Sequence, residues 1–408
     1  MSIHTSARGL PVTTSSSALA QALHAFEEQV LDYGNQAAAL FDALPLDPDC
    51  ALANAYAAAL HLFRSTREGQ IRARPFATAA KRLSAQTARE RRLIAAVERW
   101  SAQDVPGAIH ILDRAVLAEP TDLFAVKLHQ HLLFSTGASG AMLAAVGPVA
   151  AAVPNEPRVL GMLAFALDQT GSHREAERAA RAAVEIAPDP WAHHAIAHVM
   201  DAERRHDEGR SWMLAHADAW AHCTSFLYTH NWWHAALFHL ALDDRDGAMA
   251  LYHERIWAMR RDYVQDQVNA ISLLARLELV GVDVGDRWQE VADYVRPRRF
   301  DALEGFLDLH YAYALARAGD DESVGDLLGA LRARAETKTG TGAGRVALVA
   351  GEAMVAYARS DYQTAARRLG SVVADISLLG GSTVQRQLFS TLLTSARAGG
   401  HRSLELAA

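Results

Sequence analysis

Apolar residues recur every three or four positions along most of this chain, a spacing that places them on one face of an α-helix. From residue 89 to residue 188, large and small apolar positions also repeat in the same order in successive segments. In the segment that begins at Pro157, this order comprises Leu160, Leu163, Ala164, Leu167, Gly171, Ala176, Ala180 and Ala183. The pattern predicts pairs of antiparallel helices, each pair joined by a tight turn at the glycine.

Three prolines mark the ends of these segments. Pro120, Pro154 and Pro188 are each 34 residues apart, which is the period of tetratricopeptide repeats. The segment counted from Arg89 has the same order of packing residues, and the next segment has Gly137 at the turn position. We therefore predict an all-α fold, namely a tetratricopeptide-repeat-like α-solenoid of antiparallel helix pairs.

The remaining chain divides by pattern into further segments. Residues 1–17 are polar and rich in Ser and Thr, and we expect a flexible N-terminus. Residues 18–88 predict N-terminal helices, residues 89–260 the repeats, and residues 261–408 a helical region that closes the groove of the solenoid. Within the last segment, residues 336–345 (ETKTGTGAGR) lack the P-loop pattern and predict a mobile linker between helices.

Composition narrows the classes of protein. A net charge of −7 and a pI near 6.2 argue against nucleic acid as the main partner. The two cysteines, Cys50 and Cys223, exclude a disulfide framework and favour a reducing compartment. Neither a signal peptide nor an apolar run of about 20 residues is found. We therefore expect a cytoplasmic protein that does not bind membranes, and the oligomeric state stays open.

Two histidine pairs share one spacing. His194 and His198 stand in HAIAH, and His230 and His234 stand in HNWWH. On helices, each pair places its imidazoles one turn apart on one face. In the repeat register, His194 and His198 occupy positions that are normally apolar and buried. Because first helices of successive repeats are neighbours, we expect the two pairs to face each other across one seam.

Three interpretations of this seam stay open. Imidazole pairs at this spacing can chelate a divalent transition metal, for which Zn or Fe are the natural candidates. The same histidines can instead form a metal-free ligand or catalytic pocket, or a hydrogen-bonded structural seam. The glutamate of the HExxH motif is absent from both pairs. The other histidines between Trp191 and Trp257 share no spacing, and we interpret them as surface or incidental residues.

Several short motifs are spread along nearly the whole chain. They are Gly9-Leu10-Pro11, Glu119-Pro120-Thr121-Asp122, the His194–His198 helix, His230-Asn231-x-Trp233-His234, Gly281-Val282-x-Val284-Gly285-x-Arg287-Trp288-Gln289 and Leu379-Gly380-Gly381-Ser382-x-x-Gln385-Arg386. In these motifs the chain resembles the tetratricopeptide repeat protein 38 family nearly end to end. The resemblance implies no settled activity.

The resemblance does imply that further polar residues belong to the same site as the four histidines. Asp266 and the Asp308-Leu309-His310 segment match the family pattern, and we expect Asp308 and His310 to lie outside the buried stripe of their helix. Ser382 is expected to cap a helix that begins at Thr383. Arg386, one turn into that helix, together with the helix N-terminus predicts an anion site, although a plain surface turn is the simpler alternative.

The leading functional hypothesis is therefore a polar, histidine-rich pocket in the solenoid groove that binds a small anionic molecule. In this hypothesis a divalent metal supports hydrolase or lyase chemistry, Asp266, Asp308 and His310 orient rings or transfer protons, and Arg386 binds the anion. The alternative is a scaffold whose concave groove holds a peptide or protein partner, as most tetratricopeptide proteins do. The concentration of histidines in one seam favours the pocket.

Overall fold

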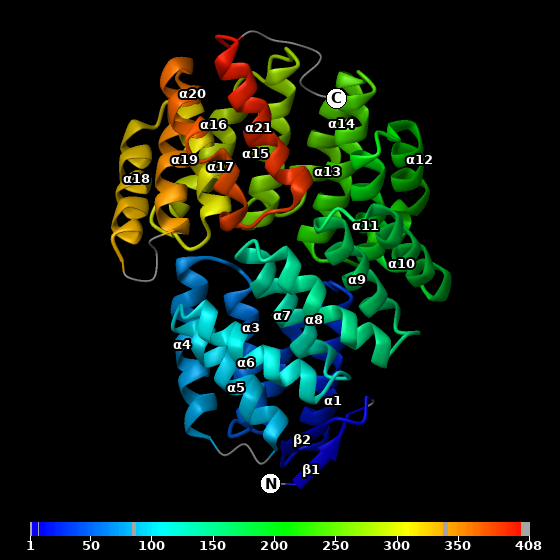
Figure 1. The fold of residues 1–408 in the computed structure, drawn as a ribbon. Coiled ribbons are helices and arrows are strands. Elements are labelled where there is room, and N and C mark those ends of the chain that lie inside the picture. Colours follow the sequence, from blue (N-terminus) through cyan, green and yellow to red (C-terminus); the bar gives the residue numbers. More distant parts are fainter. Residues whose placement is uncertain (1, 7, 84–86, 338–341, 401–408) are drawn as a thin grey trace. The chain divides into compact units, whose positions relative to one another are not determined.

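The computed structural model describes residues 2–6, 8–83, 87–337 and 342–400. Nearly all of its secondary structure is helical, and most helices pack against neighbours in the sequence, as in a helical repeat array (Figure 1). Part of the predicted 336–345 linker, residues 338–341, lies outside the described residues. The chain forms two compact units: residues 1–133, 139–195 and 221–224 make the first, and residues 134–138, 196–220 and 225–408 make the second.

The first unit begins with a β-hairpin. Strands β1 (Ser2–Thr5) and β2 (Pro11–Thr14) pair antiparallel, with Ile3 opposite Thr13. Val12, Thr13 and Thr14 of β2 are buried. The prediction that residues 1–17 are flexible is therefore wrong for the hairpin and for the start of the first helix.

Buried acidic side chains explain why this polar segment is ordered. The backbone N–H and the hydroxyl of Thr13 donate to Glu90, at 2.7 and 2.8 Å. The Thr14 hydroxyl donates to Asp47 at 2.6 Å. Each carboxylate lies far away in sequence, so the Ser- and Thr-rich composition alone did not reveal these bonds.

The first unit is otherwise built from helices. Four small residues of the predicted order, Ala164, Ala176, Ala180 and Ala183, are fully buried, as expected. The leucines of that order, Leu160, Leu163 and Leu167, are only half-buried. Within this unit α3 packs against α4 and α5, α5 against α6, and α9 against α8 and α10. The elements are α1 (Ser17–Leu31), η1 (Ala37–Ala39), α2 (Leu40–Ala43), η2 (Leu44–Leu46), α3 (Ala51–Leu62), α4 (Arg67–Arg82), α5 (Ala88–Ser101), α6 (Val105–Ala118), α7 (Leu123–Ser135), α8 (Ser139–Ala152), α9 (Pro157–Gln169) and α10 (His173–Ile186).

Helix α11 (Pro190–Ala202) passes from the first unit into the second. In the second unit α13 packs against α12, α14 and α15, α15 against α17, α17 against α19, and α21 against α15 and α20. The elements are α12 (His206–His216), η3 (Ala217–Trp220), α13 (Ser225–Ala241), α14 (Arg245–Leu251), η4 (Tyr252–Ile256), α15 (Val264–Leu279), α16 (Arg287–Val295), η5 (Arg296–Arg298), α17 (Gly305–Arg317), α18 (Asp321–Ala335), α19 (Ala343–Ala358), α20 (Tyr362–Gly370), η6 (Val373–Leu379) and α21 (Thr383–Arg397).

The turns within the helix pairs share one backbone feature. Each contains a residue with positive φ, a conformation that glycine adopts most easily. Gly137 and Gly171 were predicted from the repeat register, and their φ angles are +70° and +80°. The same feature recurs at residues that the sequence did not identify as turn positions: Gln103, Arg204, Asp243, Gly319 and Ser360.

Side-chain caps start several of the helices. The Ser382 hydroxyl accepts from the N–H of Gln385, whose side chain bonds back to Ser382, so α21 begins at Thr383 as predicted. Four second helices of pairs begin in a similar way, because a carboxylate accepts from an N–H three residues on. These N-cap residues are Asp104, Asp244, Asp320 and Asp361.

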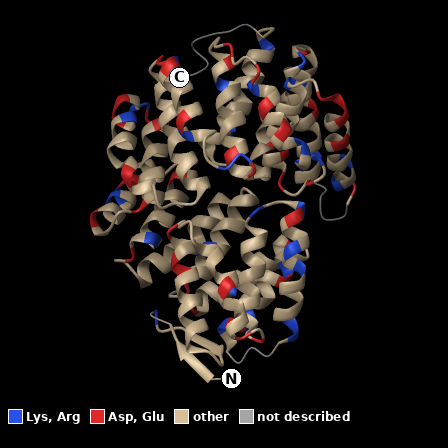
Figure 2. Ribbon diagram, turned by 180° about the vertical axis from the view of Figure 1, so that it is seen from behind, with Lys and Arg blue, Asp and Glu red and all other residues tan. Residues whose placement is uncertain are grey.

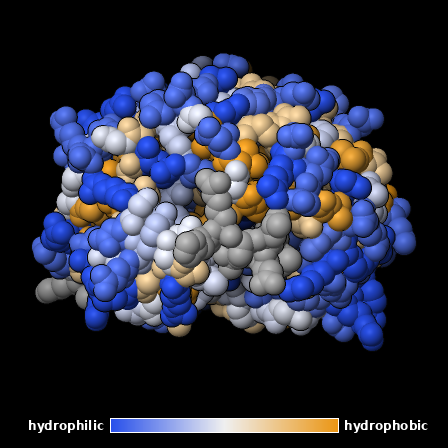
Figure 3. Space-filling view, turned by 90° about the horizontal axis from the view of Figure 1, so that it is seen from above, coloured by the Kyte–Doolittle hydropathy of each residue, from blue (hydrophilic) through white to orange (hydrophobic). Residues whose placement is uncertain are grey.

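Charged residues of both signs are interspersed along the helices of each unit (Figure 2). Many form local pairs, such as Arg181 with Glu177 and Arg72 with Glu68. The face in Figure 3 is largely hydrophilic, with hydrophobic residues towards its middle. None of the helices in the described part of the chain is long and apolar enough to span a membrane.

Candidate metal centre

Four buried histidines meet between α11 and α13. His194 and His198 lie one turn apart on α11, and His230 and His234 lie one turn apart on α13. Each is at most 3 % exposed. Each offers one ring nitrogen, and the four nitrogens lie within 4.8 Å of one another. The expectation that the two pairs face each other is therefore confirmed.

The imidazoles pack against one another and against indole rings. The His234 ring centre lies 4.7 Å from that of His198 and 4.9 Å from that of His230. The His230 ring stacks on Trp233 at 5.2 Å with an interplanar angle of 8°. On α11, the Trp191 ring lies 4.5 Å from His194. These contacts restrict ring rotation and exclude bulk water.

Burial keeps the histidines of α13 neutral. It lowers the pKa of His230 to about 3, although the hydrogen bond that the ring donates to Asn269 opposes the change. Burial also holds the pKa of His234 well below its ordinary value, helped by the neighbouring His198 and His230. Neutral imidazoles have a lone pair, which is the form that metal ions bind.

The spacing of the nitrogens is close to that of a metal site. Zinc binds imidazole nitrogen at about 2.0–2.1 Å, so a tetrahedral shell holds its nitrogens about 3.4 Å apart. A separation of at most 4.8 Å therefore needs only small side-chain movements to reach this shell. The group contains no carboxylate, so among the described residues it is a shell of four neutral ligands.

A hydrogen-bond chain reaches the cluster from α15. The Nδ1 atom of His230 lies 2.9 Å from the Asn269 side-chain oxygen. The Asn269 amide donates to the Thr229 hydroxyl at 3.1 Å, and that hydroxyl donates to Asp266 at 2.9 Å. The Asn269 oxygen can only accept, so Nδ1 of His230 is the donor of this contact and carries the proton. The lone pair is then on Nε2.

Asp266 therefore lies behind the cluster. Besides Thr229, the carboxyl group accepts from the Ser225 hydroxyl. Burial raises the pKa of Asp266 to about 7, although these hydroxyls and Arg260 favour the ionised form. The structure thus connects this residue to His230 through two intermediate side chains, which suits the orientation of a ligand ring.

His310 lies on α17, outside the group of four. Its Nδ1 atom donates to the Phe306 carbonyl at 2.8 Å, which leaves Nε2 as an acceptor. That Nε2 atom is buried and has no hydrogen-bond partner among the described residues. Burial lowers the pKa of His310 to about 4, and Arg276 also contributes. Because Arg276 lowers the pKa of His234 as well, its charge influences both histidines.

Asp308 lies in a different environment. Burial raises the pKa of Asp308 to about 8, with Arg334, Asp301 and Glu304 as the charges that influence it. None of the four clustered histidines is among these groups. The expectation that Asp308 and His310 lie outside the buried stripe of α17 is wrong, since each is 1 % exposed. Helix α17 packs against α15, α16, α18 and α19, and its residues 306–316 are all buried, polar ones included.

Arg386 is directed to its own helix terminus. Its guanidinium donates to the Gly381 carbonyl and, at 3.4 Å, to the Thr383 hydroxyl. Burial lowers its pKa. The predicted cap of α21 is present, but Arg386 is bonded to the turn that precedes the helix.

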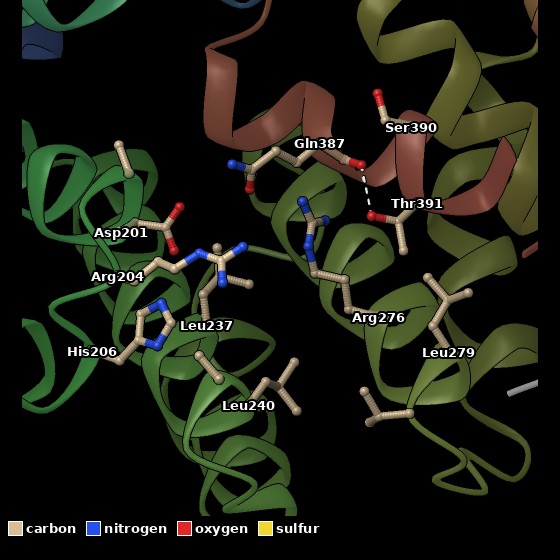
Figure 4. A pocket seen from close by; sticks show the side chains of 13 residues that line it. Asp201, Arg204, His206, Leu237, Leu240, Arg276, Leu279, Gln387, Ser390 and Thr391 are labelled. Carbon is tan, nitrogen blue, oxygen red and sulfur yellow. Dashed lines mark hydrogen bonds between the residues drawn. The ribbon is translucent and has the colours of Figure 1, made fainter. Parts of the chain in front are cut away.

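A pocket of about 360 Å³ opens in the second unit, one turn further along α11 and α13 than His198 and His234. Asp201, Arg204 and His206 come from α11, the adjoining turn and α12; Leu237 and Leu240 come from α13 (Figure 4). Arg276 of α15 and Gln387 of α21 complete the polar wall. Burial raises the pKa of Asp201, while His198 is the strongest of the groups that favour its ionised form.

Sequence reasoning missed several of these residues. His206 was interpreted as incidental, yet it lines the pocket. Asn269 and Arg276 were not singled out either, although with the predicted Asp266 they recur at intervals of three and seven on α15 and form a polar stripe at helical spacing. That stripe was visible in the sequence, but only the structure shows that its residues contact His230, Thr229 and Trp233 of α13.

No protein-family model matches the chain. The resemblance to the tetratricopeptide repeat protein 38 family therefore stays a prediction from the motifs.

Proposed function

We propose that the four histidines of α11 and α13 bind one divalent transition metal ion, with Zn²⁺ and Fe²⁺ as the candidates. The observation that carries the proposal is the convergence of four buried ring nitrogens within 4.8 Å. Imidazole nitrogens that converge from two facing helices are a ligand set that suits divalent transition metals such as Zn and Fe. The Asn269 contact, which leaves Nε2 of His230 as the ligand atom, is the support that such sites commonly have.

The charge of such a site favours anions. Four neutral imidazoles leave the double positive charge of the ion uncompensated in a buried position. A hydroxide ion or an anionic substrate then completes the neutralisation. This supports a small anionic molecule as the ligand of the site.

We propose that the protein is a metal-dependent hydrolase or lyase of a small anionic compound. If the four histidines held a metal ion, a fifth position would have to be added to the shell for a water molecule or a substrate oxygen, and the ion would then supply Lewis acidity to it. Asp201 follows His198 by three residues on α11 and lines the pocket, which suits proton transfer at that opening. Asp266 has the positioning role that its bonds to Ser225 and Thr229 support.

We also propose that the helix pairs are tetratricopeptide-like repeats. Helix pairs near a 34-residue period, with packing alanines and shared turns, support tetratricopeptide-like repeats. The histidine motifs support membership of the tetratricopeptide repeat protein 38 family.

The test is metal content. Protein purified without a histidine tag is stripped with a chelator, then loaded separately with Zn²⁺, Co²⁺ and, without oxygen, Fe²⁺, and bound metal is counted by mass spectrometry. We expect about one ion per chain, with the visible spectrum of nitrogen-bound cobalt. His230→Ala combined with His234→Ala should abolish binding.

His110→Ala is the matched control, because His110 is exposed on α6. This variant should retain the metal. Failure of the wild-type chain to bind any of the three ions overturns the proposal, and so does full binding by the doubly substituted chain. Circular dichroism checks that the variants remain helical.

A further inference from the structure

Two arginines enter the pocket from opposite walls (Figure 4). Arg204 stands in the turn after α11, with φ of +58° and an exposed side chain. Its guanidinium has no hydrogen bond or ion pair with any residue in the described part of the chain. An arginine held in a strained turn without a protein partner is available to a ligand.

Arg276 is fixed on the other wall. It donates to the Val384 carbonyl at 3.1 Å, and its guanidinium lies 5.3 Å from the Trp233 ring centre. Bonds to Ser272 hold it from within α15. Burial disfavours its charged form, and Asp201 opposes this effect. The group is therefore pre-organised before any ligand arrives.

The rest of the pocket combines charge with apolar surface. Asp201 is the acidic residue of the lining, so two guanidinium groups leave an excess of positive charge. Leu237, Leu240 and Leu279 supply apolar surface. A volume of about 360 Å³ is in the range of small-molecule sites.

We propose that this pocket binds a small amphipathic anion, with a carboxylate or phosphate head group between Arg204 and Arg276 and a short apolar chain against the leucines. Guanidinium groups bind both kinds of oxyanion through paired hydrogen bonds. Binding of the anion stands on the pocket alone, whereas its role as the substrate rests on the proposed function.

The probes are hexanoate and hexyl phosphate, with hexanol and hexylammonium as charge controls. Titration calorimetry is performed on the full chain, both metal-free and metal-loaded. We expect one or both anions to bind, and the two control compounds to bind at least 10-fold more weakly. Affinity should rise about fourfold per methylene from butyrate to hexanoate.

Arg204→Asn tests the head-group contact, because Asn tolerates positive φ and so keeps the turn. We expect a loss of affinity of about 10- to 100-fold. Arg204→Lys should retain part of the affinity, and Arg174→Gln, an exposed substitution on α10, should retain all of it.

Equal binding of hexanol and hexanoate, or unchanged affinity in Arg204→Asn, overturns the proposal, as does failure of both anions to bind. Anion binding by a chain that takes up no metal overturns only the metal site. Metal binding without anion binding overturns only the pocket assignment.

Discussion

The Nδ1 atom of His230 on α13 lies 2.9 Å from the Oδ1 atom of Asn269 on α15. This contact selects the tautomer of a candidate metal ligand. It also links the ligand to Asp266 through Thr229. A side chain that no histidine pattern indicates thus determines which nitrogen of His230 carries the proton.

Removal of this contact should weaken metal binding. Asn269→Leu deletes the acceptor, so His230 loses its fixed tautomer, and we expect metal affinity to fall about 10- to 100-fold. Asn269→Asp keeps an acceptor and should bind at least as tightly as the wild-type chain. Competition with a coloured chelator measures both affinities.

Asn54→Leu is the control for this experiment. Asn54 is a buried amide of the first unit that bonds to the Pro48 and Cys50 carbonyls. Its loss should lower stability and leave the metal affinity unchanged. Equal metal affinity in Asn269→Leu and the wild-type chain would contradict the role of Asn269.

Metal affinity should depend on the protonation of Asp266. Its folded pKa is about 7, so above pH 7 the ionised carboxylate accepts from Ser225 and Thr229. Below pH 7 the neutral acid no longer offers a charged acceptor to Thr229, which weakens the chain of bonds that holds Asn269 against Nδ1 of His230. We expect affinity to fall severalfold from pH 8 to pH 6.

Asp266→Asn removes this titration. Since the pKa of His230 is about 3, protonation of that ring does not interfere in this range. Chelator competition at several pH values should therefore give a flatter profile for Asp266→Asn than for the wild-type chain. Parallel profiles would rule out the link.

Asp308→Asn should stabilise the protein increasingly as the pH rises. The folded pKa of about 8 exceeds the ordinary value of 3.8, so the folded state binds more protons than the unfolded state between these values. Stability therefore falls with rising pH across this window, by up to about 1.4 kcal/mol per pH unit. The substitution removes that loss.

Urea unfolding at pH 5, 6.5 and 8 measures the difference between Asp308→Asn and the wild-type chain. A difference that is constant with pH would show that Asp308 does not titrate as described. Metal content should be the same in both proteins, because the charges that influence Asp308 belong to other residues than the clustered histidines.

Arg89→Met should destabilise the first unit strongly. The Arg89 guanidinium bonds to Glu27 at 2.9 Å and to Asp122 at 2.7 Å, and all three side chains are nearly inaccessible. Loss of the cation leaves two buried carboxylates without their partner, at a cost of about 3–5 kcal/mol. Urea unfolding followed by circular dichroism measures the change.

Arg72→Met is the comparison, since the Arg72–Glu68 pair is exposed on α4. That substitution should change the free energy of unfolding by less than about 1 kcal/mol. Similar losses in the two variants would contradict the importance of burial.

Much of the fold follows from local pattern. Gly171, the packing alanines and the period of the prolines predicted the helix pairs, and Ser382 predicted the start of α21. Each signal acts within one or two helical turns. The N-terminal hairpin was not predicted, because its order depends on Glu90 and Asp47, which are distant in sequence.

The candidate site also has residues that the sequence predicted and residues that only the packing of helices revealed. The i, i+4 spacing of His194 with His198 and of His230 with His234 was readable, because a helix determines which residues share a face. The sequence could not assign Asp308, Arg386 or Arg204, because their surroundings come from other helices. What a polar side chain on a helix contacts depends on which other helices pack against it.

By itself, the sequence therefore determined the helix pairs and the two histidine pairs, since both depend on the 3.6-residue period of a single helix. Only the tertiary structure decided that Asn269 meets His230, that Asp308 has other charged neighbours, and that Arg276 and Arg204 enter one pocket. These relationships join helices that are far apart along the chain, and packing of side chains, not local spacing, determines which of them meet.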